Sequence, residues 1–324
     1  MSKTKVFIDG AEGTTGLTIR KRLEKLAENS HIEILQISEA LRKDRDERKK
    51  YLNAADFVFL CLPDDASKEA VSLIENDSTR VIDASTAHRI ENDAPTAHRI
   101  EKGWTYGFPE LSPERREKIR VSKRVAIPGC YASGFLALAR PLTHRGIIPG
   151  DYPVTCYAIS GYSGGGKKAI AEYQNEKRNA ELDGARLYAL TQEHKHLREM
   201  MHHSGLKFGN MPMFNPIIDD FYSGMIVNIP VITRTLPEKY QKDTAQTILN
   251  AYKEHYNQQH SRIRVVEDYN EPFLAANALS GSDEMELFVF GKNEHVLLTA
   301  RLDNLGKGAG GAAVQCFELM KGNS

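Results

Sequence analysis

The chain of 324 residues carries 43 Lys and Arg and 43 Asp and Glu side chains, so its formal net charge is zero. A balanced charge does not favour partners such as nucleic acid or an anionic membrane surface, and no apolar run approaches the roughly 20 residues of a membrane span. The length predicts two domains. The four cysteines show no CxxC or zinc-like spacing, which indicates a reducing, cytoplasmic setting without disulfides.

A glycine-rich turn follows the first predicted strand, residues 5–9, and precedes a helix that ends near residue 28. The turn has the spacing GxxGxxG, a variant of the dinucleotide-binding fingerprint, in which glycines let the backbone approach a pyrophosphate at the helix N-terminus. The motif alone also fits an ordinary strand-to-helix turn, but its flanking elements are the context that the fingerprint requires. The predicted cofactor-binding residues here are Gly10, Gly13, Thr14, Thr15 and Gly16.

The second predicted strand, residues 31–37, ends at Ser38 and not at the acidic residue that would bind a ribose 2′-hydroxyl. The cations Arg42 and Lys43 follow shortly. A hydroxyl residue with nearby cations suits a 2′-phosphate, so the sequence favours NADP over NAD. The alternative is that residues 42–50, a dense mixed-charge run, form a solvated helix face.

Two further strands are predicted at residues 56–63 and 80–83, and the first of them is almost continuously apolar. A run of this kind is typical of a parallel strand that is buried on both faces. Strands that alternate with helices across short loops predict a Rossmann-like, doubly wound parallel sheet of the α/β class. We expect the ligand at the carboxyl ends of its strands.

A short tandem duplication follows, because the hexapeptide TAHRIE at residues 86–91 recurs at residues 96–101. It is too short to be a solenoid repeat. Either Arg89 or Arg99 can bind an anion, but the duplication places at most one of them for that role. A surface loop without function is the alternative for both copies.

The stretch from Val125 to Gly134 predicts a strand, a sharp Pro-Gly turn, and a helix that begins near Cys130. The free N–H groups and the positive end of the helix dipole favour an anion at this position, and the thiolate is the nucleophilic form of cysteine. Cys130 is therefore a candidate nucleophile. The alternative is a small buried residue, since free cysteine is among the most buried residue types.

The periodicity changes after residue 151. Strands are predicted at residues 154–160, 225–232, 262–266, 286–290 and 295–301, with a long helix at residues 237–258. They predict a second, α+β domain with a mixed, mostly antiparallel sheet. A glycine-rich loop at residues 161–168 lacks the spacing of a P-loop, but its amides and lysines can hold a phosphate or carboxylate.

Histidines cluster at residues 193–203 in the pattern HxHxxE. This pattern is not the helical zinc signature HExxH, and we expect no metal. On a helix, His196 and Glu199 would share a face, so that Glu199 can orient the imidazole. His196 is the predicted acid/base partner of the cysteine, with His194 as the second choice.

Together these motifs resemble N-acetyl-gamma-glutamyl-phosphate reductases of the shorter type, within the semialdehyde dehydrogenase superfamily. The resemblance rests on GxxGxxG at residues 10–16, PGCY at 128–131, SGYSG at 160–164, HxHxxE at 194–199 and NLxKG at 304–308, and it covers essentially the whole chain. It implies NADPH-dependent reduction of N-acetyl-L-glutamyl 5-phosphate to the semialdehyde and phosphate through a cysteine thioester, in arginine biosynthesis. It also implies a homotetramer or a homodimer.

The resemblance further implies a domain division and a set of contacts. The Rossmann domain would comprise residues 1–130 with a C-terminal helix at 304–324, and the catalytic and dimerisation domain residues 131–303. Further cofactor contacts are implied at Ser160, Gly161, Asn304, Lys307 and Gly308. Substrate contacts are implied at Ser85, Arg89 or Arg99, Glu110, Ser163 and Gly164.

Three alternatives remain open from the sequence. An aspartate-semialdehyde dehydrogenase would use the same chemistry on another acyl group. A non-catalytic NADP-binding sensor would need the nucleotide domain but no reactive cysteine. A zinc hydrolase based on the histidine cluster would contain stoichiometric metal.

Overall fold

The computed structural model of the chain describes residues 3–90, 103–257, 261–292 and 294–322, which form two compact units. The first unit comprises Met1–Pro109, Glu114–Pro128 and Ala309–Ser324, and the second comprises Glu110–Pro113 and Gly129–Gly308. Cys130 and residues 304–308, which the sequence analysis placed with the nucleotide-binding domain, thus belong to the second unit.

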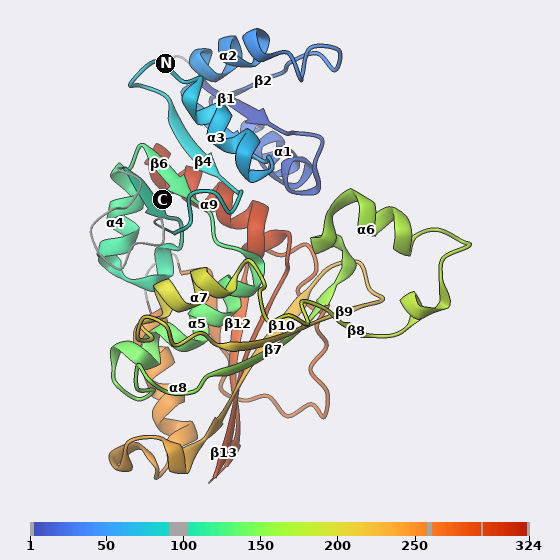
Figure 1. Cartoon of the computed structure of the whole chain (residues 1–324). Coiled ribbons are helices and arrows are strands. Elements are labelled where there is room, and N and C mark those ends of the chain that lie inside the picture. Colours follow the sequence, from blue (N-terminus) through green and yellow to red (C-terminus); the bar gives the residue numbers. More distant parts are fainter. Residues whose placement is uncertain (1–2, 91–102, 258–260, 293, 323–324) are drawn as a thin grey trace. The chain divides into compact units, whose positions relative to one another are not determined.

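The first unit contains a fully parallel sheet in the order β2-β1-β3-β4-β6-β5 (Figure 1). Its strands are β1 (Thr4–Asp9), β2 (Ile32–Leu35), β3 (Phe57–Leu60), β4 (Arg80–Asp83), β5 (Trp104–Tyr106) and β6 (Arg124–Ala126). The chain moves from β1 outward to β2 and then crosses back to β3 on the other side of β1. This reversal confirms the predicted doubly wound sheet, and it places the ligand-binding edge at the carboxyl ends of β1 and β3.

Helices cover both faces of this sheet. They are α1 (Thr14–Ala27), α2 (Arg45–Ala54), α3 (Asp64–Ser72), α4 (Pro113–Val121) and α9 (Gly311–Lys321). Successive side chains of a strand point to opposite faces, so Ile8 packs with α1 and α9 while Phe7 packs with α2 and α3. The C-terminal helix α9 contributes Phe317, whose ring lies edge-on to Phe57 with centroids 4.9 Å apart.

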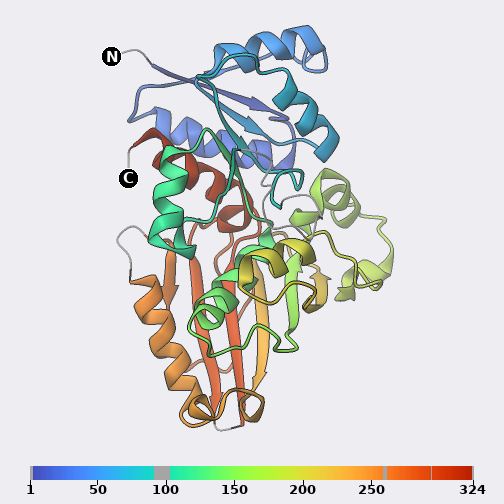
Figure 2. The same cartoon turned by 60° about the vertical axis from the view of Figure 1, so that its left-hand side comes forward.

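The second unit contains a mixed sheet in the order β11-β12-β13-β10-β7-β9-β8. Its strands are β7 (Thr155–Gly161), β8 (Arg186–Leu187), β9 (Met213–Asp219), β10 (Met225–Ile232), β11 (Ile263–Val265), β12 (Met285–Lys292) and β13 (His295–Leu302). Four of the six strand pairings are antiparallel, as predicted. The helices are α5 (Cys130–His144), α6 (Gly166–Tyr173), α7 (Leu197–Ser204) and α8 (Thr244–Tyr256), and α8 runs beside β11 and β12 (Figure 2).

Short helical turns connect these elements. The 3-10 turns are η1 (Pro109–Leu111), η2 (Tyr162–Gly165), η3 (Ala180–Asp183), η4 (Thr233–Thr235) and η5 (Glu238–Tyr240), and η6 (Gly306–Gly310) is a π-helical turn. The long helix predicted for residues 237–258 is wrong in its first third. The backbone of Asp243 has a left-handed φ of 49°, which separates η5 from α8.

Helix α5 is almost entirely buried and packs on β10 and β13. Its Gly134 allows this approach, because a Cβ there would lie 2.6 Å from a methyl carbon of Val227. Pro141 lies inside the helix and has no N–H to donate to the Ala137 carbonyl. The Tyr256 hydroxyl of α8 donates to that carbonyl at 2.7 Å, so the tertiary structure satisfies the acceptor that proline leaves.

Candidate active site

Cys130 is the first residue of α5, and Gly129 is the N-cap. The Ser133 amide donates to the Gly129 carbonyl at 2.8 Å, which closes the first turn of the helix. The first turn contains no acidic residue. The predicted location of Cys130 at a helix N-terminus is therefore observed, and the helix presents its N-terminal amides and the positive end of its dipole at this point.

Glu199 holds the turn that precedes the cysteine. Its Oε1 accepts a hydrogen bond from the Gly129 amide at 2.9 Å, and the residue is 2% exposed. Glu199 lies on α7, which packs against α5. A buried carboxylate on one helix thus fixes the backbone immediately before the first residue of another.

His196 is buried and lies at the N-cap of α7, three residues before Glu199, with a helical φ of −84° and ψ of −12°. That Glu199 orients its imidazole stays a prediction. The His196 amide donates to Nδ1 of His194 at 3.1 Å, which assigns the proton of a neutral His194 ring to Nε2. Burial, with a contribution from Lys195, lowers the pKa of His194 to about 4. His194 is therefore neutral near pH 7. The two imidazole centroids are 4.7 Å apart.

Aromatic residues surround the two histidines, and the sequence analysis missed them. The Tyr131 ring lies 5.7 Å from His194 and 5.9 Å from His196, and its hydroxyl accepts a hydrogen bond from the Tyr188 hydroxyl at 2.8 Å. Burial raises the pKa of both hydroxyls, so both stay protonated. The position of Tyr131 directly after the cysteine was the one available signal for this cluster.

The glycine-rich loop after β7 is tied to the loop after β13. The Asn304 side chain donates from Nδ2 to the Ser163 hydroxyl and accepts at Oδ1 from the Gly224 amide, both at 3.0 Å. A Cβ at Gly164 would lie 3.0 Å from Asn304 Nδ2, and one at Gly161 would lie 2.6 Å from the Phe221 carbonyl. The Ser160 hydroxyl donates to the Gly161 carbonyl at 3.0 Å.

Lys307 and Glu110 form a buried ion pair. The Lys307 ammonium lies 2.7 and 2.8 Å from the two Glu110 carboxylate oxygens, and the two residues are 1% and 2% exposed. Gly308 follows, and a Cβ there would lie 2.8 Å from Cβ of Cys130. The backbone after β13 therefore packs directly against the cysteine.

The first unit has a separate cavity at the carboxyl ends of β1 and β2, with a volume of about 660 Å³. Gly10, with φ of 85°, opens the glycine turn, and a Cβ there would lie 2.4 Å from the Cys61 carbonyl after β3. A Cβ at Gly16 would lie 2.3 Å from the Gly10 carbonyl. Gly13 caps α1 without a side-chain hydrogen bond, so the N-terminal amides of α1 are left for a phosphate ligand.

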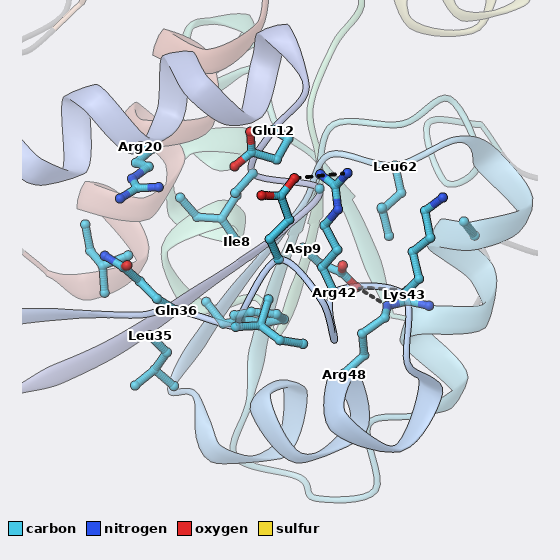
Figure 3. A pocket seen from close by; sticks show the side chains of 17 residues that line it. Ile8, Asp9, Glu12, Arg20, Leu35, Gln36, Arg42, Lys43, Arg48 and Leu62 are labelled. Atoms are coloured by element: carbon cyan, nitrogen blue, oxygen red, sulfur yellow. Dashed lines mark hydrogen bonds and ion pairs between the residues drawn. The ribbon is translucent and has the colours of Figure 1, made fainter.

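The cavity is lined by four cations, Arg20, Arg42, Lys43 and Arg48 (Figure 3). Arg42 and Lys43 lie where the sequence analysis placed them, at the edge after β2, and Ser38 is not among the lining residues. The Arg42 guanidinium is 3.8 Å from the Glu39 carboxylate. Cations at this edge suit an additional phosphate.

Arg48 is one residue of this cavity lining that sequence reasoning missed. Its guanidinium donates from Nε and Nη2 to one oxygen of Asp9 at 3.1 and 2.9 Å, and from Nη1 to Glu69 at 3.0 Å. Burial raises the pKa of Asp9, and the bonds from Arg48 oppose that rise. The available signal was an aspartate at the end of an apolar strand, because a charge there needs a partner.

The loop after β4 forms a buried polar cluster of Asp83, Ser85 and His88, next to Arg89. Arg89 is 8% exposed, and its Nη2 donates to the Ala84 carbonyl at 2.9 Å. Arg99, in the second copy of the repeat, lies outside the described residues.

Comparisons with known proteins agree with this architecture. A family model described as the semialdehyde dehydrogenase dimerisation domain matches residues 130–304, and one described as the semialdehyde dehydrogenase NAD binding domain matches residues 5–119. The chain belongs to the semialdehyde dehydrogenase family. Within this family, its curated relatives include N-acetyl-gamma-glutamyl-phosphate reductase 2 of Nostoc sp., 44% identical over 99% of this chain and 98% of that protein. The N-acetyl-gamma-glutamyl-phosphate reductase of Brucella ovis is 46% identical over 99% of both chains.

Solved structures of the family share the fold. Aspartate semialdehyde dehydrogenase II of Vibrio cholerae aligns with a TM-score of 0.70 at 17% identity, over 99% of both chains. The aspartate semialdehyde dehydrogenase of Candida albicans, solved with NADP, aligns with a TM-score of 0.64 at 14% identity, again over 99% of both chains. Because the NAD binding domain model matches residues 5–119, the first unit contains the family's nicotinamide-dinucleotide-binding domain, which fits its glycine turn and cavity.

The described residues contain no group of three or more His, Cys, Asp or Glu side chains that could hold a metal ion. Among the same residues, no helix has both the length and the apolar character needed to cross a membrane.

Proposed function

We propose that the chain is an N-acetyl-gamma-glutamyl-phosphate reductase, which reduces N-acetyl-L-glutamyl 5-phosphate to N-acetyl-L-glutamate 5-semialdehyde and releases phosphate, in arginine biosynthesis. The observation that carries the proposal is identity of 44% and 46%, over nearly the full length, to proteins of that name. It is supported by Cys130 at the N-terminus of α5, and by His194 and the buried His196, whose rings lie near that of the adjacent Tyr131 on the same unit.

The proposed reaction has two stages, the formation of a thioester on Cys130 and its reduction. Sγ of Cys130 attacks the acyl carbon, the bond from that carbon to the phosphate oxygen breaks, and phosphate leaves with the bonding electrons, which gives a thioester. NADPH, when bound, supplies the hydride that reduces the thioester carbonyl. Hydride addition leaves a negative charge on the oxygen of the resulting thiohemiacetal. This oxygen takes a proton from the acid/base residue and returns it as the C–S bond breaks, which gives the aldehyde and regenerates the thiolate.

We assign the proton transfers to His196. A general acid or base works best when its pKa lies near the working pH. The pKa of about 4 makes His194 a poor proton carrier at neutral pH, while its Nδ1 holds the His196 backbone. Replacing His196 by Asn should therefore lower kcat more than replacing His194 by Asn, and the opposite order would transfer the role to His194.

Glu199 is a positioning residue in this proposal, because its carboxylate holds the Gly129 amide. Glu199→Gln keeps an oxygen acceptor and removes the charge, whereas Glu199→Ala removes both. We expect Glu199→Gln to retain most of the activity and Glu199→Ala to lose about tenfold or more in kcat, with KM little changed. Equal loss in the two variants would show that the charge itself matters.

We propose similar positioning roles for the polar residues whose hydrogen bonds hold the glycine-containing loops of the second unit. These are Ser160, Ser163, Asn304, Glu110 and Lys307, which support the loops formed by Gly161, Gly164 and Gly308. The loop backbone is then the surface left for substrate and cofactor contacts.

We propose NADP as the preferred cofactor, on the strength of Arg42 and Lys43 in the cavity lining. The double variant Arg42→Ala/Lys43→Ala should weaken NADPH binding by about tenfold to a hundredfold and leave the weaker binding of NADH unchanged, because a charged hydrogen bond to phosphate contributes about 1.5–3 kcal/mol. Arg45→Ala is the matched control, since this exposed cation does not line the cavity. Equal weakening of both nucleotides would remove the support for NADP.

The test of the reaction is phosphate-dependent reduction of NADP⁺ in the reverse direction, with N-acetyl-L-glutamate 5-semialdehyde and L-aspartate 4-semialdehyde compared side by side. The second substrate is included because aspartate semialdehyde dehydrogenases share the fold. Cys130→Ser should bind NADPH normally and lose turnover, and the fully buried Cys156→Ala should keep it. Near-normal activity of Cys130→Ser would refute the mechanism.

We further propose a homodimer or homotetramer in a reducing, cytoplasmic setting. The four cysteines are free, and the match to a dimerisation domain supports self-association. The sheet face opposite α5 carries the apolar row Ile217, Ile159 and Ile226, continued by the exposed Leu187 of β8. Light scattering on the purified chain measures the assembly, and a strictly monomeric mass would contradict it.

A further inference from the structure

The tandem repeat leaves the chain with two identical candidates for one role. TAHRIE at residues 86–91 and at residues 96–101 are offset by ten residues, and both lie between Asp83 at the end of β4 and Trp104 at the start of β5. The two hexapeptides have the same side chains, so they do not by themselves indicate which copy binds the anion. The contacts of the first copy do indicate it.

The Asp83 carboxylate organises the first copy from the base of the loop. The residue is 0% exposed, and its Oδ1 accepts from the Ser85 amide at 2.8 Å. Its Oδ2 accepts from the Ser85 hydroxyl at 2.7 Å and from Nδ1 of His88 at 2.6 Å. A buried carboxylate requires such donors, and here His88 supplies one of them.

The face of the same imidazole lies against an aromatic ring. His88 stacks on Trp104 with centroids 4.1 Å apart and planes 6° from parallel, and both residues are buried. The place between the Asp83 oxygen and the Trp104 face accommodates one imidazole. His88 fills it, so the first copy is the one built into the unit.

Arg89 follows directly and shares this burial. It is 8% exposed, its Nη2 is fixed to the Ala84 carbonyl, and it lies in the loop at the carboxyl end of β4. This is the edge of the sheet on which the glycine turn after β1 also lies, two strands away. A guanidinium held at the ligand-binding edge of an open α/β sheet suits a phosphate or carboxylate.

We propose that the first copy is the working copy: His88, clamped by Asp83 and Trp104, is a positioning residue that fixes Arg89 to bind an anionic group of the substrate, and the second copy has no part in binding. The inference rests on the proposed reductase function. It distinguishes Arg89 from Arg99, which occupies the same position in an identical hexapeptide.

The repeat supplies its own matched controls. Arg89→Ala should lower kcat/KM for the acyl phosphate by about tenfold to a hundredfold through KM, whereas Arg99→Ala should change it by less than about twofold. His88→Ala should show the same loss as Arg89→Ala, and His98→Ala no loss. A larger loss in the variants of the second copy overturns the proposal. The proposal is also overturned if each single variant keeps its activity and only the variant changed in both copies loses it, because the two copies would then be interchangeable.

A deletion tests whether a single copy is sufficient, without point substitutions. Removing residues 92–101 leaves Asp83, one TAHRIE hexapeptide and Trp104, and removing residues 86–95 gives the identical chain. We expect this chain to keep kcat/KM within about twofold of the parent, and loss of turnover with normal NADPH binding would overturn the proposal.

Two measurements separate positioning from a general structural role. His88→Asn keeps a polar donor toward Asp83 and should recover part of the activity that His88→Ala loses, with KM responding more than kcat. Trp104 is the single tryptophan, so its fluorescence should change in His88→Ala and stay constant in His98→Ala. Identical spectra in the two variants would contradict the clamp.

Binding and kinetic measurements distinguish an anion of the substrate from an anion of the cofactor. The Kd of NADPH should be the same in Arg89→Ala and the parent, while the KM of inorganic phosphate in the reverse reaction rises. A weaker Kd for NADPH with unchanged phosphate KM would move Arg89 to the cofactor and overturn the substrate assignment. If the unmodified chain shows no reductase activity at all, the proposed function falls, whereas an active parent with the wrong order of variants refutes this inference alone.

Discussion

The buried ion pair between Lys307 and Glu110 makes a prediction about stability that follows from burial alone. Both Glu110 oxygens lie within 2.8 Å of the Lys307 ammonium, and Oε1 also accepts from the Arg262 amide at 3.2 Å. Lys307→Met keeps a long unbranched side chain and removes the charge. The Glu110 carboxylate then stays buried and loses its cation.

Removing one partner of a buried ion pair costs about 3–5 kcal/mol, because the remaining charge is uncompensated. For a unit of this size, each kcal/mol corresponds to about 2–4 °C in Tm, so the expected fall is about 6–20 °C. Replacing both partners with apolar residues should recover much of that loss, since no buried charge remains.

Thermal unfolding followed by circular dichroism measures the effect on Lys307→Met and on the double variant Glu110→Leu/Lys307→Met. Lys207→Met is the matched control, because Lys207 and Asp151 form a pair of similar length, 2.6 Å, with both side chains about two-thirds exposed. We expect no measurable change in the control. The reasoning is refuted when Lys307→Met unfolds at the same temperature as Lys207→Met, or when the double variant is less stable than Lys307→Met.

Three further predictions concern single positions. Gly308→Ala should lower kcat by about tenfold, because its Cβ would displace Cys130, whereas Gly184→Ala, with open space around it, should not; equal kinetics of the two variants would contradict this contact. His194 has a folded-state pKa lowered to about 4 by burial and by Lys195, so its contribution to stability is complete above about pH 6.5 and is lost as the pH falls toward 4. His194→Gln should therefore flatten the fall of Tm over that range, and a parallel fall in variant and parent would count against it. Tyr256→Phe should cost about 1 kcal/mol in urea unfolding, because it leaves the Ala137 carbonyl without the donor that Pro141 cannot supply; Tyr240→Phe, with its bond at the surface, should cost less.

The elements of the fold that could be predicted are those whose cause is local. The strand at residues 4–9, the glycine turn and α1 follow from an apolar run and from Gly10 and Gly16, where a Cβ would collide with backbone atoms. The turn before Cys130 could also be predicted, because it follows from the adjacent Pro128 and Gly129. The helix predicted for residues 237–258 failed at Asp243, because a single residue in the left-handed region leaves no trace in the apolar periodicity.

The parts of the site that could not be predicted depend on partners far apart in the chain. Arg48 belongs to a charged run that resembles a solvated helix face, and its burial depends on Asp9, which lies 39 residues away. Lys307 and Glu110 are separated by 197 residues. Local patterns carry no information about such pairs, because each charge taken alone favours the surface.

The position of the cysteine shows why the motifs of this chain work only as a set. The turn of Gly129 is held by Glu199 on α7, and the Cys130 side chain packs against the backbone of Gly308 after β13. Three segments separated by tens of residues therefore determine where one sulfur lies. A nucleophile misplaced by about 1 Å can lose a hundredfold in rate, so each segment is constrained as strongly as the cysteine itself. This constraint explains why PGC, HxHxxE and NLxKG occur together in one chain, and why none of them alone identifies the chemistry.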